Sequence, residues 1–466
     1  MSFLRTLKHL RYVSIASCVV LVSGCSPRTI EDTLALPLVE PTVVDQPDTD
    51  AVTAARANQS TLSDTEEDQG WPALFGPDRT SSVDAAWNPI WSSNGPKVLW
   101  ETEVGTGYGS PVALGGLVVF SHRLADEEIV QCHDALTGTK IWDYRHSTSV
   151  KCEFEYSDGP YSTPLIEPDR RRVFVVSGEG RLSCVELDTG EHVWTRDFPT
   201  EYELEPGEFP VGATPFLDGN RLIHNLGAGE KGAGIVALDA ENGATLWEAT
   251  DHGAAYCSPL VAKIHDQRFL FVFTDRGLVC LDPDTGIKDW EYPHFSRAPL
   301  SYNAVSPLVF QDKVLIVTGP GPGAVCVQIK QDRTFEEVWK NRRVINCQYN
   351  TLMLRDGLVY SFTSAGQGGA ELRCVEFATG KLRWRYHSVL RRGQGLIAGD
   401  ALLLLGERGH LASLACTPDE PRVLSFTQEP LMSDPCYCSP ALSNGILFLK
   451  DEERVVALDV RPLAEP

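Results

Sequence analysis

The sequence predicts an all-β protein that folds as an eight-bladed β-propeller. Two observations carry this prediction: a turn motif that ends in tryptophan recurs along the chain, and a proline-led strand motif recurs between its copies. The composition agrees, because 39 glycines and 30 prolines in 466 residues imply many turns, and a 42% hydrophobic content allows a large core. Internal repeats of this kind are typical of propellers and solenoids.

The first 24 residues are typical of a targeting segment and are excluded from the fold. Three basic residues precede an apolar run over residues 12–22, which is too short to span a bilayer. The run ends in Ser23, Gly24 and Cys25. This ending resembles the bacterial lipobox, which implies cleavage before Cys25 and lipid attachment to its sulfur. The alternative is an ordinary signal peptide with an incidental cysteine. A serine after the cysteine favours the outer membrane over the inner membrane.

Residues 25–70 are predicted to form an acidic, disordered tether between the lipid anchor and a globular body. They contain ten acidic residues against Arg28 and Arg56, and they have almost no aromatic side chains. Such a segment buries too little apolar surface to offset the entropy of ordering. The propeller is then expected over residues 71–466, as a single monomeric domain.

The turn motif appears five times. Each copy has a small residue, an acid two residues later, a Thr-Gly or Asn-Gly turn, and a tryptophan four residues after the glycine. The glycine supplies positive φ in a hairpin, and the tryptophan lies on the return strand. The copies span residues 132–142, 184–194, 237–247, 280–290 and 374–384.

A Ser-Pro or Thr-Pro step opens an apolar strand before the turn motif. Proline is tolerated there because the first residue of a strand forfeits no interior ladder bond. Together the two motifs define four antiparallel strands, which make one propeller blade. The steps are Ser110-Pro111, Thr163-Pro164, Thr214-Pro215, Ser258-Pro259, Ser306-Pro307 and Ser439-Pro440.

The tryptophans set the number of blades, and we expect each to pack between neighbouring blades. They are Trp100, Trp142, Trp194, Trp247, Trp290, Trp339 and Trp384. A degenerate seventh blade follows, in which Phe426 is expected to replace the tryptophan. The last unit lacks its fourth strand, and residues 98–102 near the front of the chain are predicted to complete it. This pairing closes a ring of eight blades and removes exposed strand edges.

The repeat resembles the pyrroloquinoline-quinone (PQQ) repeat over essentially all of residues 71–466. Residues 71–79 and 95–100 are similar to exported bacterial PQQ-repeat proteins related to BamB-type outer-membrane assembly lipoproteins. This resemblance implies a non-catalytic scaffold for protein–protein interaction in the cell envelope. Quinoprotein dehydrogenases share the same ring, so a PQQ-dependent dehydrogenase is the main alternative.

The dehydrogenase alternative makes demands on the sequence. The resemblance implies PQQ above a Ca²⁺ ion held by Glu, Asn and Asp, usually over a vicinal Cys-Cys disulfide. The chain has no Cys-Cys pair, and Cys436 and Cys438 are separated by a tyrosine. No ligand set or haem-binding motif can be assembled from spacing. We therefore expect no catalytic residue, no metal and no cofactor. A net charge of −22 also argues against nucleic-acid binding.

Cysteine usage separates into two groups. Cys132, Cys184, Cys280 and Cys374 occupy one equivalent position in four different blades, too far apart for disulfides, and are expected to be free thiols. The pairing of the other candidates stays open. These are Cys152, Cys257, Cys347, Cys436 and Cys438.

One set of residues suggests a binding surface. Tyrosines recur just before the proline-led strands, with a glutamine in the degenerate blade, and could ring one mouth of the central channel. Tyrosine combines an apolar face with a hydroxyl, which suits an extended peptide or a sugar. The alternative is that these side chains only fill space between inner strands. They are Tyr108, Tyr161, Tyr256, Tyr302, Tyr349, Gln394 and Tyr437.

Overall fold

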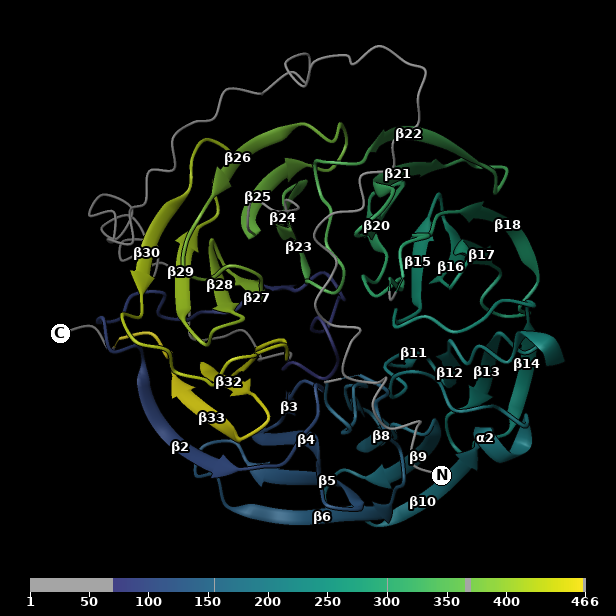
Figure 1. The fold of residues 1–466 in the computed structure, drawn as a ribbon, viewed down its shortest axis with the longest axis horizontal. Coiled ribbons are helices and arrows are strands. Elements are labelled where there is room, and N and C mark those ends of the chain that lie inside the picture. The colour runs from purple at the N-terminus through teal and green to yellow at the C-terminus, as the bar shows by residue number, and fades with distance from the viewer. Residues whose placement is uncertain (1–69, 155, 300, 365–369, 464–466) are drawn as a thin grey trace, which may run out of the picture. The chain divides into compact units, whose positions relative to one another are not determined.

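The computed structural model describes residues 70–154, 156–299, 301–364 and 370–463. In this part of the chain, eight sheets follow one another around a central axis as the blades of a β-propeller (Figure 1). The predicted all-β, eight-bladed fold is confirmed. The targeting segment, Cys25 and residues 26–69 of the expected tether lie outside the described residues.

Blades 1 to 6 each take four consecutive strands, which run from the inside of the ring outward. Blade 1 comprises β3 (Val112–Leu114), β4 (Leu117–Leu124), β5 (Glu127–Asp134) and β6 (Lys140–Ser147). Blade 2 comprises β7 (Leu165–Glu167), β8 (Arg172–Val176), β9 (Arg181–Glu186) and β10 (His192–Asp197). Blade 3 comprises β11 (Phe216–Asp218), β12 (Arg221–His224), β13 (Ile235–Asp239) and β14 (Thr245–Ala249). Short helical turns, α2 (Phe198–Glu201) and η2 (Gly229–Lys231), lie in the connections.

The remaining blades complete the ring. Blade 4 comprises β15 (Leu260–Ile264), β16 (Gln267–Phe273), β17 (Gly277–Leu281) and β18 (Lys288–Pro293). Blade 5 comprises β19 (Leu308–Phe310), β20 (Lys313–Thr318), β21 (Gly323–Ile329) and β22 (Phe335–Asn341). Blade 6 comprises β23 (Leu352–Arg355), β24 (Leu358–Ser364), β25 (Ala370–Glu376) and β26 (Leu382–Tyr386). Blade 7 comprises β27 (Gly393–Ala398), β28 (Ala401–Gly406), β29 (Leu411–Ala415) and β30 (Arg422–Phe426).

Blade 8 joins the two ends of the propeller. Its inner strands are β31 (Ala441–Ser443), β32 (Ile446–Lys450) and β33 (Arg454–Asp459), and its outer strand is β2 (Lys97–Glu103) from the front of the chain. Strand β2 pairs antiparallel with β33, with Trp100 opposite Ala457. The predicted closure of the ring by an N-terminal strand is confirmed.

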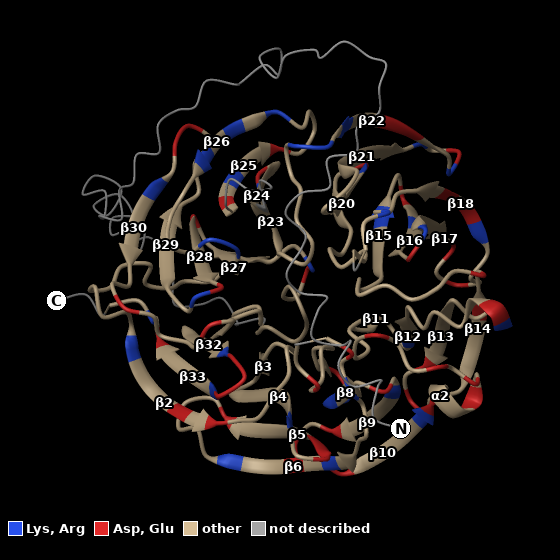
Figure 2. Cartoon of the chain, viewed as in Figure 1, with Lys and Arg blue, Asp and Glu red and all other residues tan. Residues whose placement is uncertain are grey.

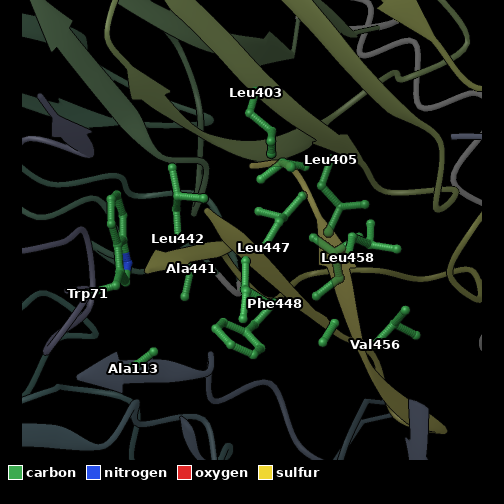
Figure 3. Close-up of a cluster of buried hydrophobic side chains, with 14 of the residues drawn as sticks. Trp71, Ala113, Leu403, Leu405, Ala441, Leu442, Leu447, Phe448, Val456 and Leu458 are labelled. Carbon is green, nitrogen blue, oxygen red and sulfur yellow. The ribbon is translucent and has the colours of Figure 1, made fainter. Parts of the chain in front are cut away.

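The closing seam is filled by a large hydrophobic cluster (Figure 3). Leu403 and Leu405 on β28 face Leu447 on β32, and Phe448 extends toward Ala113 of blade 1. Each of these side chains is fully buried. Burial of this apolar surface holds the two ends of the chain together.

Each of the seven tryptophans donates a hydrogen bond from Nε1 to a carbonyl of the next blade, at 2.7–3.2 Å. The acceptors, in order from Trp100 to Trp384, are Ala135, Leu187, Ala240, Pro283, Arg333, Phe377 and Thr417. In the five blades whose turn contains a glycine, the indole ring covers that glycine. A Cβ atom added at Gly138, where φ is +73°, would lie only 2.6 Å from the Trp100 ring. Glycine is therefore required there for both its φ value and its size.

In the degenerate blade 7, the expectation for Phe426 was wrong by one position. The register places Ser425, opposite Ser413, where the other blades carry tryptophan. The irregular segment before β2 fills this place: the Trp91 N–H donates to Ser425 Oγ at 2.9 Å, and Trp87 Nε1 donates to the Ala398 carbonyl at 2.8 Å. A small hydroxyl suits the position because aromatic rings arrive from another part of the chain.

That same N-terminal segment, residues 71–91, crosses the centre of the ring, which the sequence did not predict. Trp71 exchanges two backbone hydrogen bonds with Ala113 of β3, at 2.7 and 2.9 Å. Ten residues later, the Ser81 carbonyl accepts from Ile397 of β27, and β1 (Ser82–Val83) runs parallel to β27. We call residues 71–91 the axial segment.

Candidate functional site

The six tyrosines and Gln394 that the sequence singled out all line one central cavity of about 250 Å³. Five tyrosines lie in connections that lead from the outer strand of one blade to the inner strand of the next, and Tyr108 lies in the corresponding connection after β2. This position follows from propeller topology, because every such connection returns to the central axis at the same face. We call this site the tyrosine cavity and this side of the ring the cavity face.

Four of the tyrosine rings form a continuous row, which we call the tyrosine row. Ring centroids are 4.8 Å apart for Tyr161 and Tyr108, 5.2 Å for Tyr108 and Tyr437, and 5.1 Å for Tyr437 and Tyr349. Offset and edge-to-face contacts of this kind favour a fixed arrangement of the rings. The tyrosine row joins connections that belong to non-consecutive parts of the chain.

A second aromatic group lines the cavity together with the tyrosine row. Tyr256 and Tyr302 contact each other edge to face at 5.6 Å, and Phe209 contacts Tyr302 at 5.7 Å. Phe209 and Tyr156, which contact each other at 5.8 Å, also line the cavity. Sequence reasoning missed these two residues because they lie in long irregular connections rather than at the repeated position. Their aromatic character in otherwise polar loops was the available signal.

The axial segment supplies another part of the wall. Leu74 and Phe75 line the cavity from the centre of the ring. The segment is held there by hydrogen bonds from inner strands on both sides: the Ile166 N–H of β7 donates to the Pro72 carbonyl, and the Leu354 N–H of β23 donates to the Thr80 carbonyl. The cavity wall therefore combines tyrosines from the blades with apolar side chains from the axial segment.

Gln394 differs from the tyrosines in its surroundings. Its side chain is only 4% exposed, and its Oε1 accepts from the Thr351 backbone N–H at 2.8 Å. Its Nε2 donates to the carbonyls of Tyr349 and Tyr437, at 3.3 and 3.1 Å. Because both its amide oxygen and its amide nitrogen are hydrogen-bonded, Gln394 links two connections that carry tyrosines and fixes the spacing of the tyrosine row.

The tyrosine cavity is electrically neutral. None of its described lining residues carries a carboxylate, an ammonium or a guanidinium group. Burial raises the pKa of all six tyrosines, that of Tyr302 to about 12 with the aid of its hydrogen bond to Glu208. The hydroxyls therefore stay protonated at physiological pH and can donate or accept hydrogen bonds.

The residues of the cavity do not fit a PQQ–calcium pair. Calcium needs several oxygen ligands with carboxylates among them, and the described lining offers only hydroxyls, amides and backbone groups. Among the residues that the structure describes, no cluster of His, Cys, Asp or Glu could hold a metal ion. Within the same residues, no helix has the length and hydrophobicity needed to span a bilayer.

All cysteines in the described part of the chain are free thiols, including the five whose pairing the sequence left open. Cys326, opposite Trp339, holds the same position in blade 5 as Cys280 holds opposite Trp290 in blade 4. Sequence reasoning missed it because blade 5 lacks the Thr-Gly turn. At this position cysteine acts as a small buried hydrophobe.

The sequence is similar to several characterised proteins. Two curated proteins described as outer membrane protein assembly factor BamB are each 24% identical to it. The one from Burkholderia pseudomallei aligns over 242 residues, 50% of this chain and 57% of its own, and the one from Shewanella oneidensis over 253 residues, 52% and 61%. The chain thus spans less than two thirds of these relatives. A quinohemoprotein alcohol dehydrogenase from Comamonas testosteroni is 22% identical over 256 residues, 44% of this chain and 35% of its own.

Solved structures share the fold at low sequence identity. BamB from Moraxella catarrhalis superposes with a TM-score of 0.56 and 13% identity, covering 78% of this chain and 100% of that one. Quinohemoprotein alcohol dehydrogenase from Comamonas testosteroni superposes with a TM-score of 0.57 and 13% identity, covering 90% and 85%. These superpositions establish the fold alone.

A family-level comparison is more specific than any of these pairs. The sequence model of the family described as outer membrane protein assembly factor BamB matches residues 126–386, more than half of the chain. The matched region runs from β5 of blade 1 to β26 of blade 6 and includes all five copies of the turn motif. This chain therefore belongs to the family of the outer membrane protein assembly factor BamB.

Proposed function

We propose that this protein is a non-catalytic, lipid-anchored scaffold of the cell envelope that binds a protein partner at the tyrosine cavity. The anchor would be lipid on Cys25, and the location the periplasmic face of the outer membrane. Membership of the BamB family and the names of the relatives support a role in outer-membrane protein assembly.

The observation that carries this proposal is the chemistry of the cavity. A ring of partly exposed tyrosines with neutral polar groups between them offers anchoring surface for a protein segment, and its described lining contains no carboxylate, imidazole, thiol or amine side chain. Aromatic side chains often dominate the free energy of such contacts. Tyr156, which is 53% exposed beside Phe209, extends the aromatic surface to the rim.

Site-specific photo-crosslinking in the native envelope tests the proposal. A photoreactive phenylalanine analogue at Tyr302 should form an adduct with an envelope protein. The matched control is the same analogue at Leu136, which is 52% exposed in the turn between β5 and β6, at the face opposite the cavity. Equal adducts at both positions, or none at Tyr302, would contradict a partner site at the cavity.

Substitution of the cavity tests the same proposal by affinity. Replacing Tyr161 and Tyr256 together by Ala should weaken capture of the crosslinked partner, by roughly 2 kcal/mol for each ring. The thermal unfolding midpoint should change little, because both rings are partly exposed. A loss of stability as large as the loss of binding would mean that these rings only fill space between the inner strands.

A further inference from the structure

Five exposed arginines on the cavity face have no ion pair with any residue that the structure describes. All five residues are exposed to solvent. These residues, which we call the arginine arc, are Arg297, Arg342, Arg343, Arg391 and Arg408.

Nearly all other arginines of the described ranges form ion pairs. Apart from Arg79 in the axial segment, every other arginine in the described ranges takes part in an ion pair. The chain carries 63 acidic residues against 41 basic ones, so carboxylates are plentiful. Unpaired cations gathered in one region of such an acidic surface call for a functional explanation.

Topology brings the arc together. Arg297 lies between β18 and β19, Arg342 and Arg343 follow β22, and Arg391 follows β26, so the arc covers the connections into blades 5, 6 and 7. Arg408 lies in the turn between β28 and β29, and the neighbouring Glu407 N–H donates to the Arg392 carbonyl at 2.7 Å. Figure 2, which colours Lys and Arg blue, shows blue segments in the connection that follows β22.

The arginine arc lies in connections that also carry residues of the tyrosine cavity. Arg392, which is ion-paired with Glu407 at 2.7 Å, lies over the Tyr349 ring with its guanidinium carbon 5.4 Å from the ring centroid. Tyr302 and Tyr349 themselves lie in the connections that carry Arg297 and the Arg342–Arg343 pair. One ligand could therefore reach the cavity and the arc together.

A buried ion pair holds the centre of the arc in position. Arg373, only 5% exposed, is paired with Glu371 and donates to the Val344 carbonyl at 2.9 Å and to the Arg343 carbonyl. The connection that displays Arg342 and Arg343 is thus fixed from beneath. Such preorganisation lowers the entropy lost when a ligand binds.

Exposed acidic residues also lie on the cavity face, away from most of the arginine arc. Glu153 lies between β6 and β7, and Glu205 and Glu208 lie between β10 and β11; all three are exposed. The cavity face therefore carries acidic side chains in the connections into blades 2 and 3, and unpaired arginines in the connections into blades 5, 6 and 7. An anionic membrane lying flat on this face would meet these acidic side chains, whereas a segment of chain can contact the arginines alone.

We propose that the arginine arc binds an acidic segment of a protein partner, next to the part of that partner held in the tyrosine cavity. Guanidinium groups match carboxylates with two parallel hydrogen bonds, which makes arginine suited to this recognition. The inference rests on the proposed function as a binding propeller and adds the charge of the partner segment.

A direct binding assay tests the arc without the partner. The probe is a fluorescein-labelled oligoglutamate peptide, followed by fluorescence anisotropy at low ionic strength. The variant Arg342→Gln/Arg343→Gln should bind it about tenfold more weakly than the native chain, and added salt should weaken native binding. The control is Lys97→Gln/Lys381→Gln, which removes the same charge from exposed lysines elsewhere. Equal losses in both variants, or no loss in either, would overturn the proposal.

A second arm separates a protein ligand from a lipid surface. Vesicles of phosphatidylglycerol should not co-sediment with the protein, and binding that the arginine variant abolishes would assign the arc to lipid and overturn the proposal. The Tyr161→Ala/Tyr256→Ala variant should bind oligoglutamate like the native chain, because the probe has no aromatic side chain. If the arginine arc binds oligoglutamate but the photoreactive analogue at Tyr302 forms no adduct, the proposed partner site at the tyrosine cavity is wrong. The arginine arc is then still supported as a site for an acidic segment.

Discussion

At the scale of single residues, several histidines are buried without a charge partner. His224 is 1% exposed and stacks on Phe198, with ring centroids 6.1 Å apart. Burial lowers its pKa to about 4, and burial also lowers the pKa of His122 and His294 to about 4. The Gly105 N–H donates to Nδ1 of His122 at 3.0 Å, which requires that nitrogen to be unprotonated. Neutral imidazoles are thus part of the core.

This arrangement predicts a loss of stability in acid. Between pH 6.5 and 4, His224 binds a proton in the unfolded chain but not in the folded one, so the free energy of unfolding falls as the pH falls. Each such histidine should contribute a slope of about 1 kcal/mol per pH unit in this window. Urea unfolding at pH 7 and pH 5 should therefore show a smaller difference for His224→Gln than for the native chain. The exposed His192→Gln should keep the native difference, and an unchanged slope in His224→Gln would contradict the assignment.

The repeated residues could be predicted from the sequence because their spacing is local. The distance from the turn glycine to the tryptophan is fixed within one hairpin, and the same holds for Tyr349 and its relatives just before an inner strand. Ser425 could not be predicted in this way. Its place is covered by Trp91, which is 334 positions away in the sequence, and contacts between irregular segments leave no periodic pattern.

At the scale of elements, the N-terminal part of the described chain has two separate structural roles. Strand β2 pairs with β33 along its whole length, and the axial segment packs across the inner strands before it. The first role was predicted, because an unpaired strand and an incomplete blade imply each other. The second was not, since residues 71–91 have no alternation or repeat, and only tertiary contacts order them.

Truncations separate these roles. A chain that begins at residue 70 should unfold like the full chain, because residues 26–69 are expected to add no core. A chain that begins at residue 92 loses the buried Trp71 and Trp87 and should lose several kcal/mol, yet remain monomeric because β2 still covers β33. A chain that begins at residue 103 exposes the edge of β33 and should aggregate. Thermal unfolding with light scattering distinguishes the three, and identical behaviour would contradict both roles.

At the scale of the whole molecule, the propeller holds a neutral cavity inside a strongly acidic and unevenly charged surface. The net charge of the chain is −22, while the five residues of the arginine arc lie without ion pairs to described residues on the cavity face. The cavity residues come from all eight blades, counting the connections that lead into them, and from the axial segment, so the site exists only when the ring is closed. Such a site suits the proposed function, in which a partner is recognised by its shape and charge.

The same architecture predicts that PQQ does not bind. PQQ carries several carboxylates, and the cavity offers neither a cation to neutralise them nor the carboxylate ligands that would hold Ca²⁺ beneath them. Absorbance titration with PQQ and Ca²⁺ should therefore show no complex at micromolar concentration, and dye-linked assays should show no oxidation of alcohols or sugars. The quinohemoprotein alcohol dehydrogenase from Comamonas testosteroni, which shares the ring, provides the positive control. Calcium-dependent PQQ binding with turnover of any alcohol would instead make this protein a dehydrogenase.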